Sequence, residues 1–359
     1  MTDSPALVCR SVTVDYGPHR ALDRLTIEVA AGETLAVLGP SGSGKTTLIH
    51  AIAGFVPLSD GEIVLNGRPV ARRGMAVAPD LRSIGLVFQN YALWPHLDAV
   101  DTVAYPIRRR GVPKAQARSD AEELLRRLGM DALVRRRPAE MSGGEQQRVG
   151  LARALARQAD LYLFDEPTAH LDAAGRVAVQ EEIAAARLGS GAAALYSSHD
   201  AGEALALADR VALLRAGRLV QVGTPDEVYA RPVDVWAARL TGPASLVGAH
   251  LEHAPGRVVT VAGTPIEARL EGEHDLEGPI QLLVRPDWVS LGGPLAGVVG
   301  DVRYRGPHTD YRVDTAGGAL FVRAAGTPTA AVGDAPGVQI ERAWMLRADT
   351  SEAPPWTTG

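Results

Sequence analysis

The sequence predicts an α/β fold with a largely parallel sheet, followed by a smaller domain made of β-strands. Short apolar runs alternate with segments of helical spacing from about residue 34 to residue 214, which is typical of a parallel sheet flanked by helices. A glycine-rich loop joins the first of these runs to a helix. Beyond residue 241, short strands separated by Gly and Pro follow. At 359 residues, the chain is long enough for two domains.

The first ninety residues contain five segments with the apolar or alternating pattern of strands. They are residues 7–15, 25–29, 34–38, 62–65 and 84–88. The pair Asn66-Gly67 after the fourth segment predicts a tight hairpin turn. Residues 46–53 are predicted to form a helix that stops at Gly54.

Helical spacing predominates from about residue 100 to residue 157. The predicted helices are residues 100–110, 114–128 and 145–157, with Pro113 at the start of the second. Strand character returns at residues 161–164, 192–196 and 211–214. Residues 224–227, Thr-Pro-Asp-Glu, have the cap, proline and acids of one more helix start.

The C-terminal part has the texture of a small β-barrel. Its predicted strands are residues 257–261, 265–270, 280–285, 300–304, 311–314, 320–323 and 338–341. We therefore place the two domains at residues 1–241 and 242–350, with a helical subdomain at about residues 90–157 of the first. Residues 351–359 are rich in Pro and Thr, and we expect them to be disordered.

Composition narrows the classes of function. The formal net charge of -5 argues against a general nucleic-acid binder, whose surface is usually basic. Cys9 is the single cysteine, so no internal disulfide can form, and a reducing compartment is expected. No apolar run approaches the length of a membrane span, and the N-terminus lacks a signal pattern. We expect a soluble chain whose membrane role, if any, is exercised through a partner.

Lys45 is one of two lysines among 37 Lys plus Arg residues, and it lies in a phosphate-loop pattern. The pattern is formed by Gly39, Pro40, Ser41, Gly42, Ser43, Gly44, Lys45 and Thr46. The glycines let backbone N–H groups turn toward an anion, and the following helix adds partial positive charge. We expect Lys45 to meet the β- and γ-phosphates of a nucleotide and Thr46 to hold Mg²⁺. A plain glycine-rich turn is the alternative, which the flanking strand and helix disfavour.

Asp165 and Glu166 follow the apolar strand at residues 161–164, so they fall at the carboxyl edge of the sheet, where α/β proteins bind ligands. Two adjacent carboxylates near a polyphosphate repel each other unless a cation lies between them. We expect Asp165 to anchor Mg²⁺ and Glu166 to polarise the attacking water. A solvated turn is the alternative, and it is the better interpretation of such a pair only where no phosphate loop is present.

Ser142, Gly143, Gly144 and Glu145 are predicted to open a helix. Ser142 and Glu145 have the spacing of a capping box, which is a purely structural role. The same N–H groups and hydroxyl can also hold a γ-phosphate. The two roles are compatible if the cap opens for the nucleotide.

Gln89 and His199 each follow a predicted strand of the same sheet. The neutral amide of Gln89 can contact Mg²⁺ or water without adding charge, and His199 can hydrogen-bond a γ-phosphate. Either residue alone is more often an ordinary polar side chain. Their shared place after strands of the sheet favours the functional interpretation.

Taken in order, these motifs resemble those of the ATP-binding subunits of ABC transporters over about residues 5–240. The resemblance identifies the Walker A loop, the Q-loop at Gln89, the signature at residues 141–148, Walker B with its catalytic Glu, and the H-loop at His199. The signature departs mildly from the family pattern, with Met141 in place of Leu and Glu145 in place of Gln.

The resemblance assigns roles within the ATP site. It implies Glu166, His199 and Gln89 as catalytic residues, and Thr46, Gln89 and Asp165 as Mg²⁺ ligands. It adds three nucleotide-binding residues to those already named, which are Tyr16 as the aromatic that stacks on adenine, Thr47, and Asp172 of the D-loop. The implied fold is an α/β P-loop domain, a RecA-like core with antiparallel β and helical subdomains.

The β-rich part resembles the TOBE domain of prokaryotic importer ATPases, which implies an all-β, OB-like barrel. Residues 283–286, Leu-Val-Arg-Pro, and residues 297–313 are similar to that domain. Residues 88–96 resemble importers of ferric iron, polyamines and related solutes, so these are the leading solutes.

The resemblance also implies partners and a location. We expect a peripheral ATPase at the cytoplasmic face of the cell membrane, working with two transmembrane permease subunits and an extracytoplasmic solute-binding protein, and not with nucleic acid. Two copies are expected to dimerise head to tail, so that each ATP lies between the Lys45 loop of one copy and Ser142-Gly143-Gly144 of the other.

Three alternatives stay open. A soluble ABC ATPase of DNA repair or translation usually carries coiled coils, paired cassettes or basic tracts, and none is visible in the sequence. An exporter seldom carries such a C-terminal domain. The C-terminal domain can also act mainly as a regulatory sensor of solute, which is compatible with transport.

Overall fold

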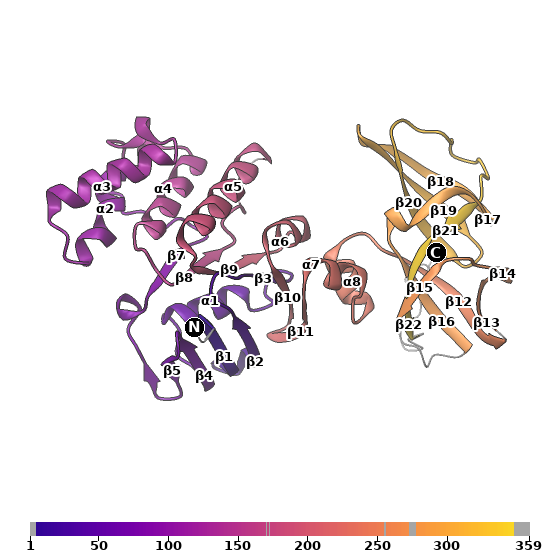
Figure 1. Cartoon of the computed structure of the whole chain (residues 1–359), viewed down its shortest axis with the longest axis horizontal. Coiled ribbons are helices and arrows are strands. Elements are labelled where there is room, and N and C mark those ends of the chain that lie inside the picture. The colour runs from indigo at the N-terminus through magenta and orange to yellow at the C-terminus, as the bar shows by residue number, and fades with distance from the viewer. Residues whose placement is uncertain (1–4, 170, 172, 255, 273–277, 348–359) are drawn as a thin grey trace. The chain divides into compact units, whose positions relative to one another are not determined.

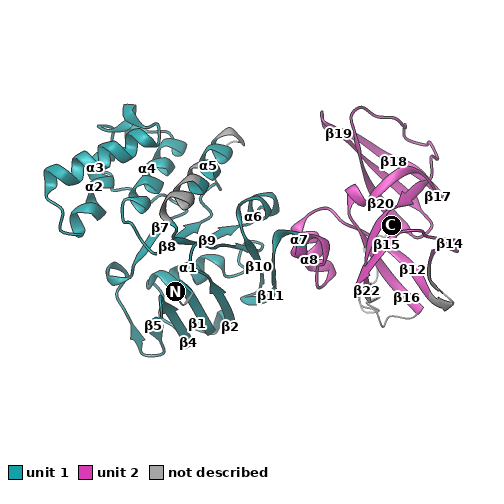
Figure 2. Ribbon diagram, in the orientation of Figure 1, with its two compact units in different colours: residues 1–226 teal, residues 227–359 magenta. Residues whose placement is uncertain are grey.

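The computed structural model describes residues 5–169, 171, 173–254, 256–272 and 278–347. The chain divides into two compact units, residues 1–226 and 227–359 (Figure 2). The predicted terminal tail at residues 351–359 lies outside the described residues. Among the helices of the described part, none has the length and apolar character to span a membrane.

The first unit is organised by a six-stranded sheet in the order β11-β10-β3-β9-β8-β7 (Figure 1). Its strands are β3 (Thr34–Leu38), β7 (Ile84–Val87), β8 (Leu161–Asp165), β9 (Ala193–Ser198), β10 (Arg210–Arg215) and β11 (Arg218–Gly223). All neighbours from β10 to β7 pair in parallel, and β11 is antiparallel to β10. The strands β3, β8 and β9 are buried along their whole length, and most of their residues are therefore apolar. The predicted parallel sheet is confirmed.

A second, antiparallel sheet has the order β2-β1-β4-β5-β6. Its strands are β1 (Leu7–Tyr16), β2 (His19–Val29), β4 (Asp60–Leu65), β5 (Arg68–Arg72) and β6 (Met75–Ala76). Asn66 and Gly67 join β4 to β5 with φ angles of 45° and 74°, which is the left-handed pair of a two-residue hairpin turn. The predicted turn is confirmed, whereas the short strands β5 and β6 were not predicted.

In the described part of this unit there are six α-helices. They are α1 (Lys45–Ala53), α2 (Ala99–Arg109), α3 (Lys114–Arg127), α4 (Gly143–Leu155), α5 (Ala173–Ser190) and α6 (Ala201–Leu207), with short 3₁₀ turns at Pro79–Leu81, Asp131–Leu133 and Pro138–Glu140. Gly54 ends α1 in the left-handed conformation, as predicted, and Pro113 is the residue just before α3. Helices α2, α3 and α4 share a hydrophobic core of their own.

The second unit is rich in β-structure, as predicted. Its strands form sheets of six, two and three members, in the orders β14-β13-β12-β16-β22-β15, β17-β21 and β18-β19-β20. The strands are β12 (Ser245–Ala254), β13 (Gly256–Val261), β14 (Thr264–Pro265), β15 (Arg269–Gly272), β16 (Gly278–Val284), β17 (Val289–Leu295), β18 (Gly297–Tyr304), β19 (His308–Thr315), β20 (Gly318–Ala325), β21 (Val338–Ile340) and β22 (Arg342–Arg347), with a 3₁₀ turn at Pro286–Trp288. The single strand expected at residues 265–270 is instead divided between β14 and β15.

Two short helices, α7 (Pro225–Ala230) and α8 (Val235–Thr241), are tied to this β-rich unit by Arg285. The Arg285 side chain is fully buried, and its guanidinium lies 4.1 Å from the ring centroid of Tyr229. It donates hydrogen bonds to the carbonyl oxygens of Tyr229, Ala238, Gly242 and Pro243 and to the Thr241 hydroxyl. The two compact units divide at residues 226/227, before these contacts, and the domain boundary at 241/242 stays a prediction.

Replacing Arg285 tests this anchor. Burial lowers the pKa of Arg285 to about 10, so the side chain stays charged at neutral pH, and Arg285→Met leaves several buried carbonyls without donors. We expect the free energy of unfolding of the second unit to fall by about 3 kcal/mol. Denaturant unfolding followed by fluorescence of Trp288 and Trp344 measures it. The exposed Arg312, paired with Asp314, supplies the control: Arg312→Met should change the value by less than about 0.5 kcal/mol. Equal losses in the two variants would contradict the anchor.

Candidate functional site

The phosphate loop lies between β3 and α1, where the strand, loop and helix occur in the predicted order. Gly44, just before α1, has a φ angle of 107°, and a Cβ atom there would lie 2.8 Å from the carbonyl oxygen of Ala21. Only glycine fits both constraints. The hydroxyl of Ser43 is buried and has no hydrogen-bond partner within the described structure. An orphaned donor in a buried loop fits a bound anion such as phosphate.

Lys45 is held above this loop with 4% of its surface exposed. Its Nζ donates to the carbonyl oxygens of Gly39 at 2.9 Å and Pro40 at 3.2 Å, and it lies 3.1 Å from Oε1 of Glu166. A compact ammonium satisfies three oxygens at this point, whereas the planar fork of Arg needs more room. The presence of a lysine at this position, in a chain whose other basic residues are nearly all Arg, therefore has a local steric cause.

Asp165 ends β8 beside the start of α1. Its Oδ1 accepts hydrogen bonds from the hydroxyls of Thr46 at 3.1 Å and Ser197 at 3.0 Å. Burial raises the pKa of Asp165, and the two hydroxyl donors oppose this shift. The buried carboxylate and the Thr46 hydroxyl form a pair of hard oxygen donors next to the phosphate loop.

Glu166 lies between Lys45 and His199. Its backbone has a φ angle of 43°, which is strained for a residue with a side chain, and its N–H donates to the Ser197 hydroxyl at 3.0 Å. The Glu166 carboxylate contacts Lys45 through one oxygen and Nδ1 of His199, at 3.2 Å, through the other. The structure therefore brings together Lys45, Thr46, Asp165, Glu166 and His199.

Among the described residues, Gln89, Tyr16, Ser142 and Glu145 make no hydrogen bond or ion pair to this cluster. Gln89 is exposed in the turn after β7, and Tyr16 is 50% exposed at the end of β1. Ser142 caps α4, and its capping box with Glu145 is confirmed. Within the described residues, no hydrogen bond or ion pair joins residues 39–46 to residues 142–145. Asp172 lies outside the described residues.

Arg153 of α4 was missed by sequence reasoning. It donates to the carbonyl oxygens of Tyr91 and Ala92, two consecutive residues with positive φ that follow Gln89. Its guanidinium also lies 5.4 Å from the ring centroid of Trp94, and burial lowers its pKa to about 10. The helix that begins at Ser142 thus fixes the shape of the Gln89 loop. The available signal was a charged residue inside an apolar helical run.

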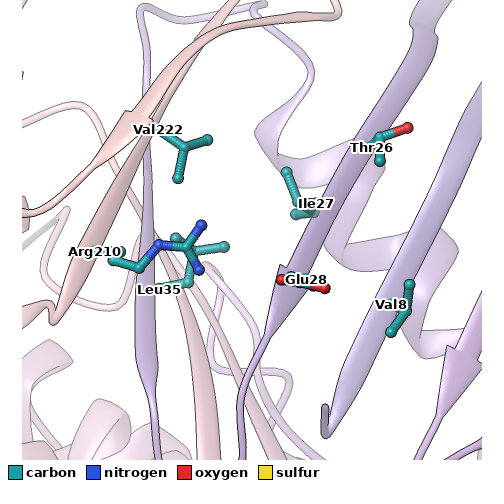
Figure 3. A pocket seen from close by; sticks show the side chains of 7 residues that line it. All are labelled: Val8, Thr26, Ile27, Glu28, Leu35, Arg210 and Val222. Carbon is teal, nitrogen blue, oxygen red and sulfur yellow. The ribbon is translucent and has the colours of Figure 1, made fainter. Parts of the chain in front are cut away.

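A separate cavity of about 170 Å³ lies between β1–β2 and the strands β3, β10 and β11 (Figure 3). Its walls are Val8, Thr26, Ile27, Glu28, Leu35, Arg210 and Val222. None of these residues belongs to the phosphate site. One of its two charged wall residues, Arg210, is paired with Glu33 at 3.1 Å.

Comparison with known proteins agrees with this geometry. Residues 22–169 match the ABC transporter family, and residues 282–346 match the TOBE domain. The chain is similar to the Fe(3+) ions import ATP-binding protein FbpC 1 of Rhizobium meliloti, with 36% identity over 88% of this chain and 90% of the relative. It is 41% identical to FbpC of Streptomyces avermitilis over 84% and 86% of the two chains. It is 37% identical to the spermidine/putrescine import ATP-binding protein PotA of Methylococcus capsulatus over 86% and 82%.

Solved structures agree as well. A dimeric ATP-binding cassette in a post-hydrolysis state, bound to ADP and Pi, superposes with a TM-score of 0.56 and 27% identity over 61% of this chain and 98% of that chain. The cbiO1 protein of Clostridium perfringens, part of the ABC transporter complex cbiONQ, gives a TM-score of 0.56 and 26% identity over 63% and 90%. With a phosphate loop, a paired Asp165-Glu166 edge and relatives that span most of its length, this chain belongs to the ATP-binding subunits of ABC transporters and carries a C-terminal TOBE domain.

Proposed function

We propose that this ATPase energises solute import across the cell membrane, with ferric iron or a polyamine as the solute. The observation that carries the proposal is the Glu166 carboxylate, held between Lys45 and His199 beside the phosphate loop. The relatives that share both domains are named for import of Fe(3+) ions or of spermidine and putrescine. The relatives reported above are not named for DNA repair or translation.

The site fits a magnesium ion bound with the nucleotide. Mg²⁺ usually takes one or two carboxylates together with substrate phosphates, rather than a cage of protein ligands. Among the described residues, no cluster of three His, Cys, Asp or Glu forms such a cage, whereas Thr46 and Asp165 offer adjacent oxygen donors. The ion would supply charge neutralisation for the phosphates. We assign Thr46 and Asp165 to hold it, with Gln89 as a further ligand once its loop closes.

In the proposed mechanism, Lys45 and the loop N–H groups bind the β- and γ-phosphates, and the released Glu166 carboxylate accepts a proton from the attacking water. His199 contacts the γ-phosphate and keeps Glu166 oriented through its Nδ1 contact. Lys45 now pairs with Glu166, so phosphate would compete with the carboxylate for the ammonium. Nucleotide binding would thereby free the base that hydrolysis needs.

The second half of the site is proposed to come from another copy. Ser142 and Gly143 are exposed, and the N-terminal N–H groups of α4 suit a γ-phosphate. In the described residues no hydrogen bond or ion pair joins them to the phosphate loop of the same chain, and a dimeric cassette is among the similar structures. We infer a head-to-tail homodimer that ATP closes and hydrolysis releases.

Membrane partners are proposed to dock next to Gln89. Phe55 is 52% exposed after α1, and its ring centroid lies 5.8 Å from that of Phe88, which precedes Gln89. An exposed aromatic beside the Gln89 loop suits a permease helix. We infer two permease subunits, an extracytoplasmic solute-binding protein and a peripheral position at the cytoplasmic face.

Glu166→Gln is expected to keep ATP binding and to lower kcat by about 10²- to 10⁴-fold, since a positioned general base contributes that much. ATPase turnover and ATP-dependent dimerisation by light scattering measure the two effects. Lys45→Ala is the contrasting variant and should lose ATP affinity, while Lys114→Ala, a change on the exposed surface, should lose neither. Substantial turnover in Glu166→Gln would refute the role of Glu166 as the base.

Uptake by cells lacking this chain tests the transport proposal. We expect loss of energy-dependent uptake of either radiolabelled ferric iron or radiolabelled spermidine, restored by the wild-type gene and not by Glu166→Gln. Measuring both solutes in the same strain makes each the control for the other. Undiminished uptake of both solutes would contradict the proposal that this ATPase energises the import of either one.

A further inference from the structure

Glu203 is a buried acid with no part in the mechanism described so far. It lies in the first turn of α6 with 7% of its surface exposed. Four neutral groups donate hydrogen bonds to its carboxylate, namely the hydroxyls of Thr168, Tyr196 and Ser198 and the side-chain amide of Gln180. Such a buried carboxylate is costly unless its oxygens are fully engaged, so this set of donors specifies one geometry.

The position of Glu203 in its helix suggests a simpler role, which the structure excludes. Asp200 caps α6, and a Glu three residues later commonly reaches back to the N–H of the cap residue. Here the N–H of Asp200 donates its hydrogen bond to the Ser198 hydroxyl instead, at 2.9 Å. The Glu203 side chain turns inward, away from the capping position, and the carboxylate is therefore held for another purpose.

Three of the four donors come from segments that carry the ATPase chemistry, whereas Gln180 lies in α5. Thr168 follows Glu166 by two residues, beyond the end of β8. Tyr196 and Ser198 lie at the end of β9, and Ser198 immediately precedes His199. One buried carboxylate thus joins the backbone that presents the proposed base to the backbone that presents the proposed γ-phosphate contact.

Local chemistry makes this link stiff. Burial, and next the charge of Glu203, raise the pKa of Tyr196, so its hydroxyl stays protonated and donates at 3.2 Å. Ser198 donates to the same oxygen, Oε2, at 2.8 Å, while Thr168 and Gln180 donate to Oε1. Hydrogen bonds to an ionised acceptor are roughly twice as strong as neutral ones. Glu166 also has a strained backbone, which persists only where its surroundings are rigid.

We propose that Glu203 is a positioning residue of the ATPase site, whose carboxylate fixes the separation of the Glu166 and His199 segments. The inference rests on the roles proposed above for those two residues. Glu203 touches neither residue's side chain in the described contacts, so it acts through Thr168 and Ser198. Its loss should affect the chemical step more than the binding of ATP, because the Glu203 carboxylate makes no hydrogen bond to the phosphate loop. In the described residues the loop meets this network at a backbone hydrogen bond, from the N–H of Gly39 to the carbonyl oxygen of Ser198.

Glu203→Gln tests the proposal. The amide keeps the volume of the side chain but loses the charge and one acceptor face, so the fold should be retained. We expect kcat for ATP hydrolysis to fall on the order of 10- to 100-fold, as small misplacements of catalytic groups do, with KM for ATP changed by less than about threefold. Ser198→Ala, which cuts the link toward His199, should reproduce part of the loss. Glu203→Asp, which keeps the charge, should recover part of it.

Two further measurements separate positioning from mere stability. Thr13→Val removes a buried hydroxyl of the same unit that binds the N–H of Arg24, and it should lower the Tm without lowering kcat. In a protein that already carries His199→Ala, Glu203→Gln should lower kcat by less than about a further twofold. The reason is that both changes act on the same catalytic arrangement. A wild-type kcat in Glu203→Gln would overturn the inference. So would a double variant in which the losses of kcat from His199→Ala and Glu203→Gln multiply in full. Wild-type kcat in His199→Ala would instead overturn the role proposed for His199, so the two failures are distinguishable.

Discussion

The pairing of three neighbouring parallel strands determines where the chemistry of this protein can occur. In the central sheet, β9 lies between β3 and β8, with Leu38 opposite Ser198 and Asp165 opposite Ser197. All three strands therefore end at the same edge, and the residues that follow them meet there. The phosphate loop, the two acids and His199 come from widely separated parts of the sequence, but the register of the sheet leaves them within hydrogen-bonding distance.

Around this edge, polar groups are satisfied in two different ways. Ser197 is fully buried and is shared between the backbone N–H of Glu166 and the carboxylate of Asp165, which holds both acids in place. The Ser43 hydroxyl, by contrast, has no partner among the described residues, and Lys45 depends on carbonyl oxygens and on Glu166. The acid side of the site is thus complete, whereas the loop side keeps capacity for an anion. This asymmetry is what a site built for a polyphosphate requires.

Features with local causes could be predicted from the sequence. The hairpin at Asn66-Gly67, the helix stop at Gly54 and the capping box of Ser142 and Glu145 each depend on residues a few positions apart. The phosphate loop and the edge acids could also be predicted, because their spacing reports a strand, a turn and a helix together.

Features that depend on distant partners could not be predicted. Arg153 and Arg285 bind backbone carbonyls supplied by other segments, and nothing near them in sequence indicates those acceptors. Glu203 has the spacing of an ordinary cap residue, and only the approach of β8, β9 and α5 shows that it turns inward. Similarly, the sequence gives no sign that the carbonyl oxygens of Tyr229 and Ala238, in α7 and α8, accept hydrogen bonds from Arg285.

We propose that one ATP is held by the phosphate loop of one copy and by the Ser142 helix of another. Disulfide trapping between two separately tagged proteins, Ser41→Cys and Ser142→Cys, both carrying Glu166→Gln, tests it most directly. Native Cys9 should not interfere, because it is fully buried and burial raises the pKa of its thiol to about 12. We expect a cross-linked dimer of the two differently tagged variants, which forms with ATP and Mg²⁺ and is lost without nucleotide. ATP-saturated protein that yields no cross-link between copies, or a doubly substituted chain that closes the disulfide within itself, would contradict it.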